Sequence, residues 1–181
     1  MTEEKEITED TTPLVIQQLR EKFADGLLSD AEVNNGVAVV VNKDNLYAIL
    51  EYLKTDLAYS MLLDITAVDN SNLEEELMKY DYARFMVVYH LYTFEGETPR
   101  IRIKVPVNDK DLIVPSIINL WKGANWLERE TYDMFGIQFE GHPNLERILM
   151  PNEFEGHPLR KDYPLRGRGE RERFNFDKQN A

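Results

Sequence analysis

Residues 125–165 read NWLERETYDMFGIQFEGHPNLERILMPNEFEGHPLRKDYPL, and this stretch separates an ordered domain from a long arm. Its start predicts a helix, because Asn125 is a favourable N-cap and Glu128 follows three residues later, as in a capping box. Gly136 can end that helix in the left-handed conformation. After Gly136, proline and glycine recur so often that long regular elements are not expected.

The predicted helix combines charge with aromatic bulk, which is unusual for a free surface. Arg129 and Asp133 are four residues apart and share a helix face, as do Glu130 and Asp133. One interpretation is an amphipathic helix with a solvated side. The favoured one is a segment buried against other proteins, where arginine–carboxylate pairs set the register. We therefore expect a partner interface that comprises Glu128, Arg129, Glu130, Asp133, His142, Arg147, Phe154, His157, Arg160, Lys161, Asp162 and Tyr163.

The residues before this stretch predict an α+β domain with a mainly antiparallel sheet and flanking helices. Residues 100–107 alternate between apolar and basic side chains, as in a strand with one buried face, and they should form a hairpin with 83–94. Helices are predicted at 13–26, 42–58, 115–122 and 125–135, further strands at 27–33, 37–41 and 61–68, a turn at 34–36 and a loop at 69–81.

The expected organisation is a disordered acidic N-terminus at 1–11, the α+β domain at 12–136 and an extended partner-binding arm at 137–181. Nothing in the pattern of the arm buries a face against the domain. We therefore expect the arm to be mobile in the free chain and ordered on its partners.

The composition restricts the classes of partner and cofactor. The 181 residues include no cysteine, which excludes disulfides and iron–sulfur clusters held by thiolates of this chain. The net charge of −12 argues against nucleic acid or anionic lipid as the main partner. No apolar run approaches the roughly 20 residues that span a bilayer, and MTEEKEITED resembles neither a signal peptide nor a transit peptide.

Two other classes of function match parts of the sequence. A metal-dependent hydrolase at residues 128–157 would use carboxylates and imidazoles as ligands, but each of His142 and His157 precedes proline and has no partner at the spacing of a metal motif. The basic tail at 160–173 has a composition compatible with RNA binding, although Glu170 and Glu172 interrupt it. The favoured interpretation is a protein that acts by contact, with no catalytic, cofactor-binding or metal-binding residue of its own.

The same residues carry a family resemblance. The stretches WLERETYDMFGIQFEGHPNLERILMP and EGHPLRKDYPL resemble the C subunit of NADH-quinone oxidoreductase, the 30 kDa subunit of respiratory complex I, as do LLDITAVD at 62–69 and VPSIINLW at 114–121. Residues 35–165 follow the family in order. Glu146 stands where the family has a basic residue, and Phe154 where it has tryptophan.

The resemblance implies a cofactor-free structural subunit in the peripheral arm of a proton-pumping complex, on the cytoplasmic side of the inner membrane. Such a subunit packs against the large subunit that helps form the quinone pocket, and near the cluster-bearing subunits. The whole complex carries electrons from NADH through FMN and iron–sulfur clusters to quinone. An equivalent subunit of a related membrane-bound hydrogenase is the alternative within this class.

Overall fold

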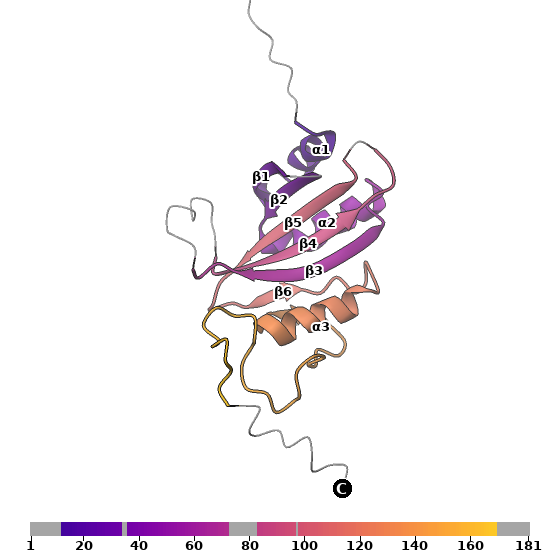
Figure 1. The fold of residues 1–181 in the computed structure, drawn as a ribbon. Coiled ribbons are helices and arrows are strands. Elements are labelled where there is room, and N and C mark those ends of the chain that lie inside the picture. Colours follow the sequence, from indigo (N-terminus) through magenta and orange to yellow (C-terminus); the bar gives the residue numbers. More distant parts are fainter. Residues whose placement is uncertain (1–11, 34–35, 73–82, 97, 170–181) are drawn as a thin grey trace, which may run out of the picture.

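The computed structural model describes residues 12–33, 36–72, 83–96 and 98–169 (Figure 1). Its helices are α1 (Leu14–Lys22), α2 (Leu46–Thr55) and α3 (Ala124–Phe135), with short 3-10 turns at Ala24–Gly26 and Lys43–Asn45. Its strands are β1 (Leu27–Val33), β2 (Gly36–Val41), β3 (Met61–Asp69), β4 (Phe85–Tyr92), β5 (Arg100–Val107), β6 (Ile113–Pro115) and β7 (Gln138–Glu140). No helix in these ranges is long and apolar enough to cross a membrane.

A five-stranded sheet in the order β1-β2-β5-β4-β3 forms the centre of the molecule. Its neighbouring strands are antiparallel except for β2 and β5, which run parallel. The strand directions follow from the connections: α2 returns the chain between β2 and β3, which run in the same direction. Two antiparallel steps, β3 to β4 and β4 to β5, then give β5 the direction of β2. A second sheet has two parallel strands, β6 and β7.

One face of the large sheet carries the core. Helix α2 contributes an apolar stripe at helical spacing, and its buried side chains are Leu46, Ile49, Leu50 and Leu53. Helix α1 adds Ile16 and Leu19 to the same cluster. On β5 the residues Ile101, Ile103 and Val105 are all fully buried, while the basic residues between them point to the opposite face.

Helix α3 lies along β3, at one edge of the sheet (Figure 1). The Thr131 hydroxyl donates a hydrogen bond to the carbonyl of Ile65 in β3 at 3.1 Å. Just before the helix, the Trp121 indole donates to the carbonyl of Ser60 at 2.9 Å. These bonds satisfy backbone carbonyls near an unpaired strand edge, which would otherwise be open to another chain.

The predicted α+β class with a mainly antiparallel sheet is confirmed, and Gly136 ends α3 with φ 77° as expected. The helix predicted at 115–122 is wrong, because Pro115 closes β6 and turns follow it. Asn125 lies inside α3 rather than at its cap, which is Gly123. The predictions for residues 1–11, for the tip of the turn at 34–35 and for most of the 69–81 loop fall outside the described ranges, and the domain boundaries stay a prediction.

We expect Gly36→Ala to destabilise the fold by about 2–3 kcal/mol. Gly36 has φ 149°, and an added Cβ would lie 2.2 Å from the carbonyl oxygen of Arg100, where β2 meets β5. At Gly96 the φ is 78° but no atom lies within 4 Å, so Gly96→Ala is the matched control, with a cost of about 1 kcal/mol from backbone strain alone. Thermal unfolding measures both, and equal losses would contradict the steric argument.

Candidate functional site

The carboxylate of Asp133 joins α3 to the arm. Its Oδ2 accepts hydrogen bonds from the backbone N–H groups of Ile148, Leu149 and Met150 at 3.0, 2.8 and 2.8 Å. Its Oδ1 accepts from the guanidinium of Arg147 at 2.6 Å. The side chain is fully buried. Four consecutive arm residues therefore converge on one helix carboxylate.

These bonds keep Asp133 ionised. Burial by itself would raise its pKa, but the N–H groups of Met150 and Leu149, the Arg147 guanidinium and the N–H of Ile148 outweigh burial and hold the pKa below its ordinary value. Arg147 also donates to the carbonyl of Gly156 at 3.0 Å and lies over the ring of Phe154 at 5.8 Å. The charged pair thus fixes a second part of the arm as well.

The C-terminal end of α3 provides a second attachment. His157 Nδ1 lies 2.9 Å from the carbonyl of Asp133, and the N–H of Leu159 donates to the carbonyl of Met134 at 3.2 Å. Arg160 donates to the carbonyl of Phe135 at 2.6 Å. These carbonyls belong to the last turn of α3, where they have no partner inside the helix. Gly136 makes room, because a Cβ there would lie 2.5 Å from both His157 and Arg160.

A third attachment joins the arm to the sheet. Asp69, at the end of β3, accepts from Arg84 and from the backbone N–H of Lys161, the latter at 2.8 Å. Arg84 in turn pairs with Asp162 at 2.6 Å. Burial would raise the pKa of Asp69, but Arg84 and the Lys161 N–H lower it to about 2. The arm is therefore held by ionised carboxylates at two places.

Glu128 has a different role from the one that its position in the sequence indicates. It is fully buried and accepts from the Ser116 hydroxyl and from the N–H of Ile117, each at 2.7 Å. Burial raises its pKa to about 7, although both hydrogen bonds act in the opposite direction. Through its two hydrogen bonds, Glu128 holds the segment between β6 and α3 against the helix from inside the core.

The structure gathers most of the predicted interface residues around α3, but in unequal roles. Glu128 and Asp133 have no exposed surface and bond to this chain, so they are corrected from partner contacts to internal groups. Arg129 does not pair with Asp133; it donates to the carbonyls of Glu146 and Arg147 at 3.0 and 3.1 Å. For the other residues the interface stays a prediction. Those that lie along the arm are Arg147, Phe154, His157, Arg160 and Tyr163, and those that are exposed are Glu130, Lys161 and Asp162. The ring nitrogen Nε2 of His142 lies 3.2 Å from the Asn125 carbonyl.

Three groups in these attachments are not among the predicted site residues: Asp69, Arg84 and Ser116. No local pattern in the sequence indicates these groups, because the arm residues that bond to Asp69 and Arg84 lie far away along the chain. The expectation that the arm buries nothing against its own domain is wrong as far as residue 162, because its bonds reach α3, β3 and Arg84.

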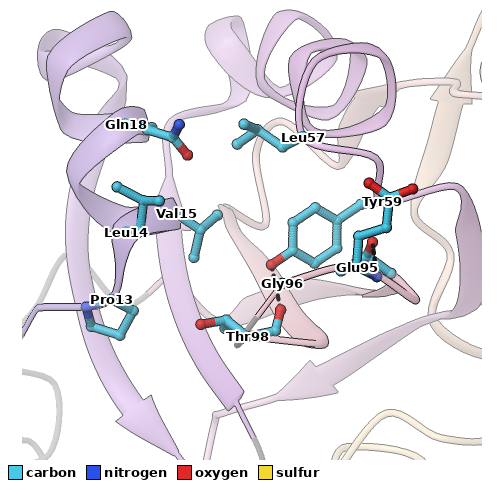
Figure 2. A pocket seen from close by; sticks show the side chains of 10 residues that line it. Pro13, Leu14, Val15, Gln18, Leu57, Tyr59, Glu95, Gly96 and Thr98 are labelled. Atoms are coloured by element: carbon cyan, nitrogen blue, oxygen red, sulfur yellow. Dashed lines mark hydrogen bonds between the residues drawn. The ribbon is translucent and has the colours of Figure 1, made fainter.

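A separate hollow lies between the start of α1, the end of α2 and the β4–β5 turn (Figure 2). The ring of Tyr59 points into it, and its hydroxyl donates to the Thr98 carbonyl at 2.6 Å. Burial raises the pKa of Tyr59 to about 12, so the hydroxyl keeps its proton. The side chains that line the hollow place no acid beside a base. Within the described ranges, no cluster of three or more histidine, aspartate or glutamate side chains is placed to hold a metal ion.

We expect Asp133→Asn to cost roughly 3 kcal/mol, because Arg147 and three N–H groups then face a neutral amide. The pKa of Asp133 is lowered, so its contribution is fully present above the ordinary value of 3.8 and is lost as the pH falls further. Thermal unfolding and tryptic cleavage of the arm at pH 7 measure the loss. Glu130→Gln, at an exposed site on the same helix, is the control and should match the wild type. Equal cleavage of all three proteins would contradict the role of Asp133.

Glu128→Gln should reduce the pH dependence of stability. The pKa of Glu128 rises from 4.5 to about 7 in the folded chain, so its contribution is present below pH 4.5 and is lost as the pH rises through 7. Between about pH 5 and pH 8, the free energy of unfolding of the wild type should fall by about 2–3 kcal/mol relative to that of the glutamine variant. Denaturant titration of both proteins at each pH gives this difference, from which the histidine contributions cancel. A difference that stays constant with pH would contradict the raised pKa.

Comparison with known proteins places this arrangement in a family. The family model described as "Respiratory-chain NADH dehydrogenase, 30 Kd subunit" matches residues 39–169, which include α3 and most of the sheet and the arm. The C subunit of NADH-quinone oxidoreductase from Citrifermentans bemidjiense is 47% identical over 152 residues, which are 84% of this chain and 89% of that protein. The C subunit from Geobacter sulfurreducens is 44% identical over 83% of this chain and 88% of its own length.

Solved structures agree. The trypsin-resistant fragment of Nqo5 superposes with a TM-score of 0.61 at 30% identity, covering 73% of this chain and all of the fragment. A chain of an archaeal membrane-bound sulfane sulfur reductase has the same fold, with a TM-score of 0.63 at 24% identity over 83% of this chain and 84% of that one. From the family match and these relatives, this chain belongs to the family of the 30 kDa subunit of respiratory-chain NADH dehydrogenase.

Proposed function

We propose that this chain is a structural subunit, without a cofactor of its own, in the peripheral arm of a proton-pumping NADH-quinone oxidoreductase. It lies on the cytoplasmic side of the membrane and holds neighbouring subunits in place. Electrons pass from NADH through FMN and iron–sulfur clusters in those neighbours to quinone, and no residue of this chain takes part in the chemistry.

The observation that carries the proposal is an arm that is fixed in shape yet presents apolar side chains outward. Leu149, Leu159 and Leu165 are 55%, 52% and 104% exposed, although Asp133 and the end of α3 bind the backbone of the first two. A backbone fixed in advance loses little entropy on docking, so such leucines contribute more of their burial energy to binding. This is the pattern of an interface rather than of an active site.

The identity of the first partner is supported by a fused relative. The C/D subunit of NADH-quinone oxidoreductase from Acinetobacter baumannii matches 84% of this chain at 42% identity, but the match covers only 25% of that longer protein. Two subunits named on one polypeptide favour neighbours that stay in contact. We therefore propose that the large subunit at the quinone pocket, which the remainder of such a fusion would supply, covers the exposed leucines of the arm.

The absence of cysteine supports the cofactor part of the proposal, since thiolate ligands must then come from other chains. A second candidate is the equivalent subunit in a complex fed by another electron donor, which the shared fold of the sulfane sulfur reductase chain favours. Purification of this chain from its native membrane separates the two. Flavin- and NADH-binding subunits in the preparation support the first. Another redox subunit in their place, such as a nickel-binding large subunit, supports the second.

Replacing two of the three exposed leucines tests the arm. We expect Leu159→Ser with Leu165→Ser to weaken capture by the quinone-pocket subunit at least about tenfold, because apolar anchors are lost from the interface. The melting temperature of the free chain should stay within about 2 °C, since both side chains are already exposed. Leu14→Ser with Leu28→Ser, at 67% and 41% exposed positions of α1 and β1, is the matched control. Equal capture of the two double variants would contradict docking through the arm.

A further inference from the structure

The face of the five-stranded sheet opposite the core presents a row of basic side chains on β5. Arg100, Arg102 and Lys104 form a straight column there, because alternate residues of a strand point the same way. We call these three side chains the cation column. Adjacent members are about 6.6–6.8 Å apart along the strand. They differ from Arg20, Arg84 and Arg147 in what surrounds them.

Within the described ranges, no hydrogen bond or ion pair reaches the side chains of the cation column. Elsewhere on the molecule Arg20 pairs with Asp30, Arg84 with Asp69 and Arg147 with Asp133. The chain has 33 acidic and 21 basic residues, so acidic partners are in excess. Three adjacent cations without a partner are therefore unusual for this sequence, and repulsion between them makes the free face electrostatically unfavourable.

In the cation column Arg100 is exposed, and Arg102 and Lys104 are half-buried. On β2 the register places Ala38 beside Arg102 and Val40 beside Lys104, and both are too short to cover a guanidinium or ammonium group. On the other side, β4 and β3 carry His90 and Asp64 in the same row as Arg102. Burial and then Arg102 lower the pKa of His90, although Asp64 opposes this, so the positive field at the column is not cancelled.

Apolar groups complete this face at its β3 margin. Met61 and Val68 are 43% and 46% exposed, and they lie at the two ends of β3. This margin is separated from the row of unpaired cations on β5 by one strand, β4. Exposed apolar side chains and unpaired cations on one face have the composition of an interface: apolar area for burial and charges for register.

We propose that the cation column and the apolar margin of β3 form a second docking surface, which binds an acidic segment of a neighbouring protein subunit. A segment in extended conformation with aspartate or glutamate at alternate positions has the same repeat as the column and fits over the short side chains of β2. Carboxylates suit the site better than a polyanion such as RNA or anionic lipid, because a chain of net charge −12 repels an extended negative surface but can accept a few local carboxylates. The proposal depends on the proposed function only in that the partner belongs to the same complex.

Zero-length crosslinking of the assembled complex tests the surface directly. A carbodiimide adds to a carboxyl group and activates it. The amine of Lys104 then attacks the activated carbonyl carbon and forms an amide, while the reagent leaves as a urea that retains one carboxyl oxygen. Mass spectrometry then identifies the two residues joined. We expect Lys104 to be linked to an acidic residue of another subunit, and Lys110 and Lys122, which are exposed elsewhere, to be linked at least about tenfold less often to that residue. A link from Lys104 only to acids at 3–10 or 74–76 of this chain would overturn the proposal.

Charge removal provides the second readout. Arg102→Gln with Lys104→Gln should lower the salt concentration at which this chain leaves the complex, and weaken its retention about tenfold, while Lys110→Gln with Lys122→Gln has the same charge change and should not. Arg102→Lys should behave as the wild type because the charge stays. The two proposals can fail separately. The proposed function stands and this inference falls if the leucine variant of the arm is lost from the complex, the Arg102 and Lys104 double variant is retained normally, and Lys104 forms no link. If the wild-type chain is absent from the complex, both fall.

Discussion

The arrangement of the molecule depends on the carboxylate of Asp133. A long coil has no ladder to satisfy its backbone, so its N–H groups must find other acceptors or remain in water. One buried oxygen accepts three of them, from Ile148 to Met150, and the other neutralises Arg147. Such charge-assisted bonds are stronger than neutral ones. The position of this single side chain therefore sets the path of the arm, and through Arg147 it also fixes the loop around Gly156.

Helix α3 connects two parts of the protein that differ in their origin of stability. Toward the sheet, the fully buried Glu128 accepts a hydrogen bond from Ser116, which follows β6. The Thr131 hydroxyl donates to the Ile65 carbonyl at the edge of β3. Toward the arm, α3 uses Asp133 and the carbonyls of its own last turn. The sheet is held by apolar burial, whereas the arm combines polar bonds that reach back to the helix with apolar contacts of Ile137, Phe139, Leu145 and Met150 to the core. This division suits a subunit whose arm presents its leucines to a neighbour, because the arm need not use those leucines to hold itself.

Patterns confined to neighbouring residues predict the structure well, and contacts between distant residues do not follow from them. The alternation at 100–107, the stripe of α2 and the glycine at 136 each depend on one element, and each prediction is confirmed. The helix expected at 115–122 is wrong because Pro115 pairs in register with Glu140, a strand contact between residues far apart in sequence. Glu128 and Asp133 resemble surface charges in the sequence because the groups that donate to them, at Ile117 and at the 148–150 backbone, lie 11 to 17 positions away in coil. The attachment of the arm at Asp69 and Arg84 likewise has no local signal.

The uneven distribution of charge has a consequence for how the subunit reaches its place in a complex. A body with an excess of acids and one uncompensated row of cations on β5 is an electric dipole as well as a net anion. In the field of a larger protein, such a body experiences a torque before any atoms touch, and it rotates during approach. The fraction of productive collisions then rises at low ionic strength and falls once the Debye length, about 8 Å in physiological salt, is shorter than the approach distance. The row of cations would therefore act on the rate and order of assembly, even where the final contact area is dominated by leucine.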